Sequence, residues 1–222
     1  MKTLPTSLPE RLKEYGNFLS ECGVQFFDLK CETGPRSWVM PQLEKMIRSC
    51  SRCPLGQQRK QAVPGEGKWQ AELMFVGEAP GAEEDAQGRP FVGRAGQLLT
   101  RIIEAMTFKR EEVYITNVVK CRPEGNRTPH SEEVELCSPF LEAQIKTINP
   151  KVIVALGKVA ADFFIPGNLS LAELRGNFFS YENIPVMPTY HPAFVLRNEW
   201  RKEIKRQVWQ DMQKVMALLG RR

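Results

Sequence analysis

The chain has 222 residues, of which 42% are hydrophobic and 26% are charged. These proportions are typical of an ordinary folded domain and exclude disordered and fibrous proteins. No apolar run approaches the roughly 18 residues of a membrane span, and the N-terminus lacks the apolar core of a secretory signal. We therefore expect a cytoplasmic protein with no membrane partner. Its six cysteines are then better explained as metal or cluster ligands than as disulfides.

Positive charge is concentrated at the C-terminal end. The chain has 31 Lys and Arg against 26 Asp and Glu, a net charge of +5. Residues 195–222 contain eight basic and three acidic residues and carry that whole excess. This pattern fits either a polyanion-binding surface or a solvated helix face, and charge alone does not decide between them.

Residues 1–40 are expected to form a small N-terminal extension, to which the sequence assigns no role. Ser7 and Glu10 have the spacing of a helix cap, and apolar residues recur at helical spacing over 12–19. Three residues indicate a joint before the main domain at 41–222: Gly34, Pro35 and Pro41.

The main domain alternates strand-like and helix-like segments. Short apolar runs predict four strands: Leu73–Val76, Val113–Val119, Val152–Leu156 and Val186–Thr189. Helical spacing predicts helices around Leu98–Ile103, at Val134–Ile148, at Ala160–Phe164 and over the basic C-terminus. This order predicts an α/β fold with a central four-stranded parallel sheet flanked by helices. Because ligands bind beyond the carboxyl ends of such strands, the loops that begin at Gly77, Asn117, Gly157 and Tyr190 are the candidates for a site.

Four cysteines could bind one metal centre: Cys50 and Cys53 in a C-x-x-C pair, Cys121 after the second strand, and Cys137 in the following helix. Four sulfur ligands suit either zinc or an iron–sulfur cluster. Reduced core thiols and a redox C-x-x-C remain open alternatives. The other two cysteines, Cys22 and Cys31, are interpreted as packing residues.

The first loop reads GEAPGAEEDAQGRPFVGRAGQLL. Its carboxylates suit proton handling or the orientation of a water molecule rather than phosphate binding, and the GK[ST] ending of a P-loop is missing. The carboxylates are Glu78, Glu83, Glu84 and Asp85. Phe91 lies where the loop re-enters the protein, as either a core residue or a stacking platform.

Polar residues also follow two other predicted strands. Asn117 ends an apolar strand, so its amide is either a satisfied structural group or a reader of a nucleobase edge. Three cations follow it: Lys120, Arg122 and Arg127. His191 is either a helix-start residue or a donor aimed at developing negative charge. The apolar residues 194–196 before Arg197 could enter a base stack while the cation binds a phosphate.

Together these segments resemble the iron–sulfur uracil-DNA glycosylases, family 4 of the uracil-DNA glycosylase superfamily. The matching motifs run in the family's order from about residue 45 to the C-terminus. They are the C-x-x-C pair, GEAPGAEEDAQGRPFVGRAGQLL, YITNVVKCRPEGNR, the helix with Cys137, and HPAFVLR. The resemblance implies a three-layer αβα fold and removal of uracil from DNA by base flipping and hydrolysis of the N-glycosidic bond. The product is an abasic site, as in base excision repair. A non-catalytic nucleic-acid-binding module and a redox protein are the alternatives.

The resemblance also implies roles for particular residues. The uracil pocket would be formed by the backbone of Gly77, Glu78 and Ala79, a stacking ring at Phe91, Asn117 at the uracil edge, and His191 at O2. Glu78 would orient the water, with Glu84 and Asp85 as alternates, and Glu84 would exclude the thymine methyl. Arg197, Leu196 and Arg122 would contact DNA. A [4Fe–4S] cluster would be bound by Cys50, Cys53, Cys121 and Cys137. We expect a monomer.

One position departs from a neighbouring branch of the superfamily. Some of those relatives bind uracil-DNA covalently through a histidine in a basic KRRIH loop. The corresponding position lies near Asn126, within PEGNRTP, and holds no histidine. We therefore expect turnover with product release rather than a stable protein–DNA adduct.

Overall fold

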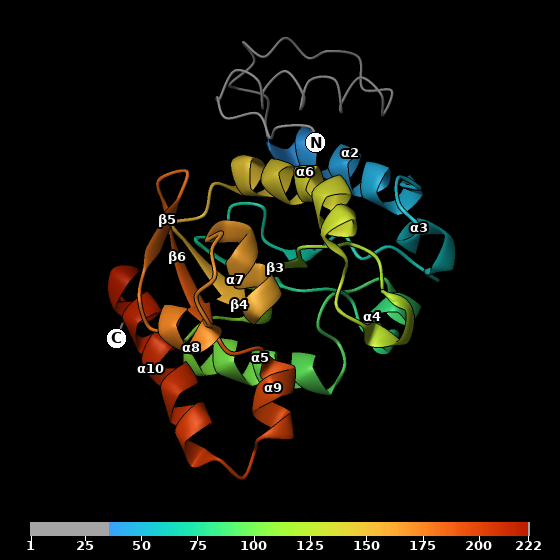
Figure 1. The fold of residues 1–222 in the computed structure, drawn as a ribbon. Helices are drawn as coiled ribbons and strands as arrows, with labels where there is room; N and C mark the ends of the chain where they lie inside the picture. The colour runs from blue at the N-terminus through green and yellow to red at the C-terminus, as the bar shows by residue number, and fades with distance from the viewer. Residues whose placement is uncertain (1–35, 222) are drawn as a thin grey trace.

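The structure is a computed structural model that describes residues 36–221 (Figure 1). The helix expected over 12–19, and both Cys22 and Cys31, lie outside the described residues. Helix α2 (Arg36–Ser49) contains Pro41, and Met40 is fully buried. The boundary expected at residue 40 thus falls inside a helix. The division into an extension and a main domain remains a prediction.

A mixed sheet forms the centre of the molecule. Its strands are β1 (Glu66–Gly67), β2 (Leu73–Gly77), β3 (Tyr114–Asn117), β4 (Val152–Leu156), β5 (Phe179–Tyr181) and β6 (Ile184–Thr189), in the order β1-β3-β2-β4-β6-β5. The inner four pair in parallel, whereas β1 and β5 are antiparallel edge strands. The predicted parallel sheet is confirmed, and the edge strands add to it. They are only two and three residues long and only partly buried, so no apolar run marks them.

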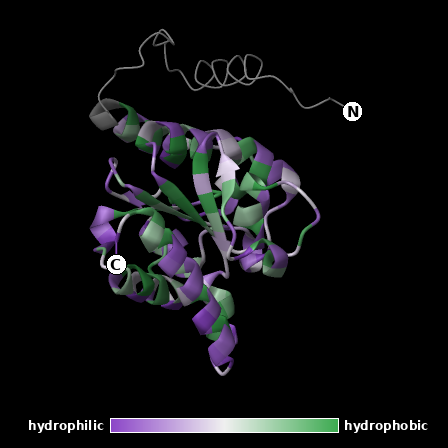
Figure 2. Cartoon of the chain, turned by 90° about the vertical axis from the view of Figure 1, so that its left-hand side faces the viewer, coloured by the Kyte–Doolittle hydropathy of each residue, from purple (hydrophilic) through white to green (hydrophobic). Residues whose placement is uncertain are grey.

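The central strands are apolar throughout because both faces of the sheet are covered. In β2, Met74 and Val76 point into one core cluster, and Leu73 and Phe75 point into the other. Alternate side chains of a strand point to opposite faces, so a strand covered on both sides has no polar face. Figure 2 shows hydrophobic residues along the central strands and on the helices that face them.

Helices cover each face of the sheet and give three layers (Figure 1). Helix α2, helix α6 (Ser131–Ile148) and helix α7 (Lys158–Phe164) supply one core cluster, and helix α5 (Arg94–Ala105) and helix α10 (Lys202–Leu218) supply the other. The remaining helices are α3 (Leu55–Gln58), α4 (Ala82–Gln87), α8 (Leu171–Leu174) and α9 (Pro192–Arg197), with 3-10 turns η1 (Arg110–Glu112) and η2 (Glu124–Asn126). None of the described helices combines the length and apolarity needed to cross a membrane.

Candidate active site

A cavity of about 690 Å³ lies at the carboxyl ends of the parallel strands. Segments that follow β2, β3, β4 and β6 all contribute to its wall, as expected for this class of sheet. The residues predicted for the site that line it are Glu78, Ala79, Glu84, Phe91, Asn117, His191 and Arg197.

Three side chains from separate segments lie near one another: Asn117 and Phe91 pack beside Gly77, and His191 packs beside Phe91. A Cβ on Gly77 would lie 2.4 Å from Asn117 Oδ1 and 2.5 Å from Phe91 Cζ, so a larger residue there would displace these two side chains. The ring centroids of Phe91 and His191 are 5.6 Å apart. The aromatic ring, the amide and the imidazole therefore lie close enough to contact one small planar molecule.

Asn117 presents an unpaired polar atom to this cavity. The residue is only 1% exposed, and its Oδ1 has no hydrogen-bond partner within the described residues. A buried acceptor without a donor costs about 1–3 kcal/mol, and such atoms in folded proteins call for an explanation. A ligand that donates a hydrogen bond to Oδ1 would provide one.

The backbone of Asn117 is held by Lys120. The fully buried Lys120 Nζ donates to the Asn117 carbonyl at 2.6 Å, to Thr116 Oγ1 at 2.7 Å and to Gln144 Oε1 at 2.7 Å. Burial lowers the pKa of Lys120 to about 7. This lysine lies in the interior and fixes the end of β3, so it adds no surface charge beside the cavity.

His191 is held as a neutral hydrogen-bond donor. It precedes α9, and its Nδ1 accepts a hydrogen bond from the Ala193 N–H at 3.1 Å. Burial lowers the pKa of His191 to about 4, Arg197 acts in the same direction, and Glu84 opposes them. At neutral pH the single ring proton is therefore on Nε2, because Nδ1 is the acceptor.

A buried ion pair anchors the strand end before His191. Thr189 Oγ1, at the end of β6, donates to Asp211 Oδ2 at 2.7 Å, and Arg175 Nε donates to the same carboxylate at 3.1 Å. Asp211 is fully buried on α10. The segment that leads into His191 is thereby tied to a helix on one face of the sheet.

The carboxylates of the first loop have different environments. Glu78 lines the cavity, and burial raises its pKa despite the opposing effect of Arg197. Glu84 also lines the cavity, but its Oε1 accepts from the N–H groups of Val92 and Gly93 at 2.8 and 3.0 Å. Asp85 is absent from the lining and accepts from the Lys60 N–H at 2.9 Å. Of these three carboxylates, Glu78 is the best placed to act on a water molecule in the cavity.

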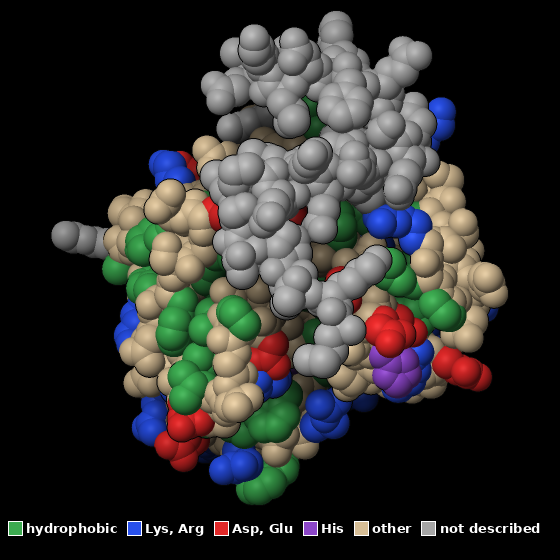
Figure 3. Space-filling model, turned by 45° about the horizontal axis from the view of Figure 1, so that its top comes forward, with side chains coloured by type: hydrophobic (Ala, Val, Ile, Leu, Met, Phe, Trp, Pro, Cys, Tyr) green, Lys and Arg blue, Asp and Glu red, His purple; other side chains and the backbone are tan. Residues whose placement is uncertain are grey.

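The residues expected to contact DNA differ in their surroundings. Arg197 is exposed at the cavity rim, whereas Leu196 and Arg122 do not line the cavity. Arg122 Nε donates to Asn126 Oδ1 at 2.7 Å, and Arg127 pairs with Glu133 at 2.7 Å. On the face shown in Figure 3, basic and acidic side chains are interspersed.

The four cysteines expected to bind a cofactor line one small cavity of about 10 Å³. We call this group the four-cysteine corner: Cys50, Cys53, Cys121 and Cys137. Arg59 Nη1 donates to Cys121 Sγ at 2.8 Å, and the Lys120 N–H donates to Cys137 Sγ at 3.3 Å. Burial raises the pKa of the Cys121 thiol and raises that of Cys137 to about 12. Within residues 36–221, no three His, Cys, Asp or Glu side chains are grouped to hold a single metal ion.

Several residues at the site escaped sequence analysis. Lys158 lines the cavity, and Asp211 and Arg110 anchor segments that border it. Only Asp211 had a detectable signal, since it is an acid on the same helical stripe as the apolar Val208 and Val215. The partners of Arg110 are 10 to 44 residues away along the chain, and no local pattern reveals them.

Comparisons with known proteins show the family of this chain. The model of the Uracil DNA glycosylase superfamily matches residues 64–213. The chain is 46% identical to a type-4 uracil-DNA glycosylase of Thermotoga maritima, over 83% of this chain and 96% of that protein. It is 45% identical to a type-4 enzyme of Saccharolobus solfataricus, over 78% and 83%, and 31% identical to a type-5 enzyme of Pyrobaculum aerophilum, over 72% and 84%. The chain therefore belongs to the uracil DNA glycosylase superfamily and, within it, to the type-4 uracil-DNA glycosylases.

Proposed function

We propose that this protein removes uracil from DNA by hydrolysing the N-glycosidic bond, leaving an abasic site for base excision repair. One observation carries this proposal. The unpaired Asn117 Oδ1 lies beside the Phe91 ring and a neutral His191, in a cavity open to an extruded base. The type-4 relatives are named for this activity.

Recognition requires a base that has left the helix. Extrusion of the nucleotide costs a few kcal/mol, and less when the base is mismatched. Phe91 stacks on the uracil ring, and the backbone of residues 77–79 borders it. Asn117 Oδ1 accepts the uracil N3–H while its amide group donates to O4. Cytosine presents an acceptor at N3 and an amino group at C4, so the amide in this orientation is mismatched to cytosine.

Cleavage produces an oxocarbenium-like sugar and a uracil anion with charge on O2. The neutral His191 donates from Nε2 to O2, and a donor in such a position contributes about 10²–10³ in rate. Glu78 orients the attacking water, and its charge offsets that of the sugar cation. Glu84 borders the C5 side of the base and excludes the thymine methyl. Leu196 enters the gap left by the base, and Arg197 and Arg122 bind the backbone phosphates.

The four-cysteine corner is proposed to bind a [4Fe–4S] cluster. Four thiols around one space provide the ligand set of such a cluster, and the N–H donors of Arg59 and Lys120 point at two of the sulfurs. When bound, the cluster supplies a cross-link among separate segments. The chain's own residues then place the end of β3, since Lys120 contacts both Cys137 and Asn117. The four cysteines are free thiols rather than disulfides. Because thiols stay reduced inside cells, this fits the expected cytoplasmic location of a DNA-repair protein.

The activity is tested with oligonucleotides that carry U·G, U·A, single-stranded uracil, T·G or hypoxanthine. Alkali cleaves the strand at each abasic site. Uracil substrates should be cleaved and T·G should not. Glu78→Gln should lose most activity while the cluster's visible absorbance is unchanged. A protein that binds these oligonucleotides and leaves every uracil in place would overturn the proposal.

A further inference from the structure

Phe91 adopts a backbone conformation that its residue type disfavours. Its φ angle is +50°, in the left-handed region that a side chain with a Cβ rarely adopts. The backbone of α5 packs directly against it: a Cβ on Gly96 would lie 1.9 Å from the Phe91 carbonyl oxygen. Such strain persists only where the surroundings hold it in place.

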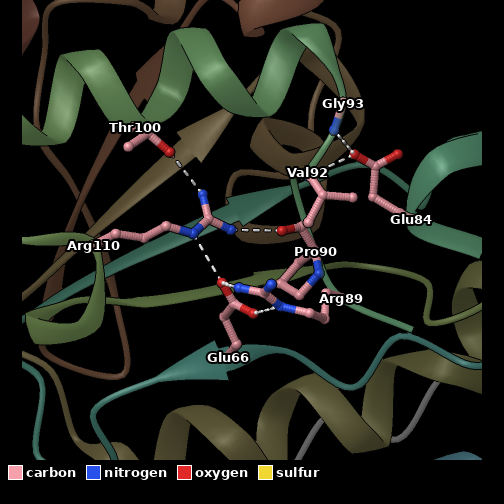
Figure 4. A network of polar contacts seen from close by, with 8 residues as sticks. All are labelled: Glu66, Glu84, Arg89, Pro90, Val92, Gly93, Thr100 and Arg110. Carbon is pink, nitrogen blue, oxygen red and sulfur yellow. Dashed lines mark hydrogen bonds and ion pairs between the residues drawn. The ribbon is translucent and has the colours of Figure 1, made fainter. Parts of the chain in front are cut away.

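The two peptide planes that flank Phe91 are each held by a charged side chain (Figure 4). Arg110 Nη2 donates to the Pro90 carbonyl at 2.6 Å, which fixes the plane before Phe91. Glu84 Oε1 accepts from the Val92 N–H at 2.8 Å, which fixes the plane after it. The torsions φ and ψ of Phe91 are the rotations between these two planes. Fixing both planes therefore fixes the direction of the Cα–Cβ bond from which the ring extends.

Arg110 is itself fixed by partners from other elements. Its Nε donates to Glu66 Oε1 at 2.8 Å and its Nη1 to Thr100 Oγ1 at 3.0 Å. Glu66, on β1, also pairs with Arg89 at 2.8 Å. The Arg110 side chain is 17% exposed, against 59% for Arg89. The short edge strand and η1 thus present a rigid guanidinium to a single carbonyl of the loop.

From this geometry we propose that Arg110, oriented by Glu66, is a positioning residue that acts through Phe91. It holds the Pro90–Phe91 peptide so that the ring faces the extruded base, without contacting that base itself. Arg110 is absent from the cavity lining, whereas Phe91 is part of it. The inference rests on the proposed stacking role of Phe91.

The test is a double-mutant cycle of Arg110→Met and Phe91→Leu, with Arg89→Met as the matched control. Both arginine variants remove one cation and one partner of Glu66, but only Arg110→Met loses the bond to the Pro90 carbonyl. The measured quantities are the single-turnover rate of uracil excision and the Kd for product DNA that carries an abasic site. If Arg110→Met does not fold, Arg110→Lys replaces it, because one ammonium lacks the guanidinium fork that spans three acceptors.

Arg110→Met should lower the single-turnover rate by about 10- to 100-fold, the scale expected for a misplaced contact group. The Kd of Arg110→Met for product DNA should equal the Kd of Arg89→Met. The single-turnover rate of Arg89→Met should stay near that of the unmodified protein. In the Phe91→Leu background, Arg110→Met should have little further effect. Full additivity, or an equal loss in Arg89→Met, would overturn the positioning role while leaving the function intact. An unchanged rate in Phe91→Leu would instead overturn the stacking role on which the inference rests.

Discussion

The cavity and the four-cysteine corner lie on either side of Lys120 but are built differently. In the cavity, hydrogen bonds within the protein hold Asn117 and His191 at the ends of β3 and β6. In the corner, by contrast, burial raises the pKa of Cys121 and Cys137, and no three ligands are grouped around a point. Hydrogen bonds within the protein thus place the polar groups of the cavity, whereas the proposed cluster would link the segments of the corner.

The largest expected effect is a loss of excision rate in His191→Ala, a variant that should leave the four-cysteine corner intact. His191→Ala removes the Nε2 donor, so the single-turnover rate of uracil excision should fall by about 10²–10³-fold. The visible absorbance of the cluster should be unchanged, because His191 lies outside the corner. Loss of that absorbance in parallel with the rate would show that the two regions are not independent.

Cys121→Ser tests the corner directly. A group that binds only the folded chain, with a Kd about 1,000 times below its free concentration, stabilises the fold by about 4 kcal/mol. Loss of the group should therefore lower Tm by about 8–16 °C for a chain of this size. Thermal unfolding followed by circular dichroism, with iron content measured on the same sample, checks this. A variant that lost its iron and kept its Tm would contradict the structural role of the group.

Asn117→Ala should separate activity from stability. The variant should lose about 10- to 100-fold in kcat/KM, the equivalent of one or two hydrogen bonds to the base. Its free energy of unfolding should be unchanged or raised, because the deleted Oδ1 has no partner in the described chain. The measurements are steady-state kinetics and urea unfolding. A large loss of stability would mean that the amide is structural.

Arg197→Met should shift the acid limb of the pH–rate profile. In the proposed mechanism the active forms are the Glu78 carboxylate and neutral His191, so the rate should fall as pH drops through their pKa values. Arg197 lowers the pKa of both groups. Its removal raises both, and the acid limb should move to higher pH. Single-turnover rates measured across the acid range test this, and a limb that stayed in place or moved lower would contradict it.

The smallest expected effect is the absence of a covalent adduct. Asn126 lies near the position that the resemblance assigns to the histidine of a neighbouring branch, and Arg122 donates a hydrogen bond to its side chain. Incubation with uracil-DNA followed by a denaturing gel should show free protein. Asn126→His offers a matched variant in which an adduct could form. A denaturant-stable band with the unmodified chain would refute the prediction.

The sequence revealed those parts of the fold that local pattern controls. β2 and β4 were visible because each is a continuous apolar run buried on both faces. The position of Asn117 could be predicted because it is a polar residue at the end of such a run. The sequence could not reveal that Lys120 is buried or that Arg110 bonds Pro90, because those contacts depend on tertiary packing. The same holds for the closeness of Phe91 and His191, which lie on separate loops.

In the proposed complex, Phe91, Asn117 and His191 close around one extruded uracil. This arrangement is tested most directly by a crystal structure of the protein with DNA that carries uracil in an uncleavable nucleotide. We predict a uracil ring stacked on Phe91, with N3–H and O4 on the Asn117 amide and O2 facing His191 Nε2. A base bound outside the cavity, or one that reached fewer than all three side chains, would rule out this arrangement.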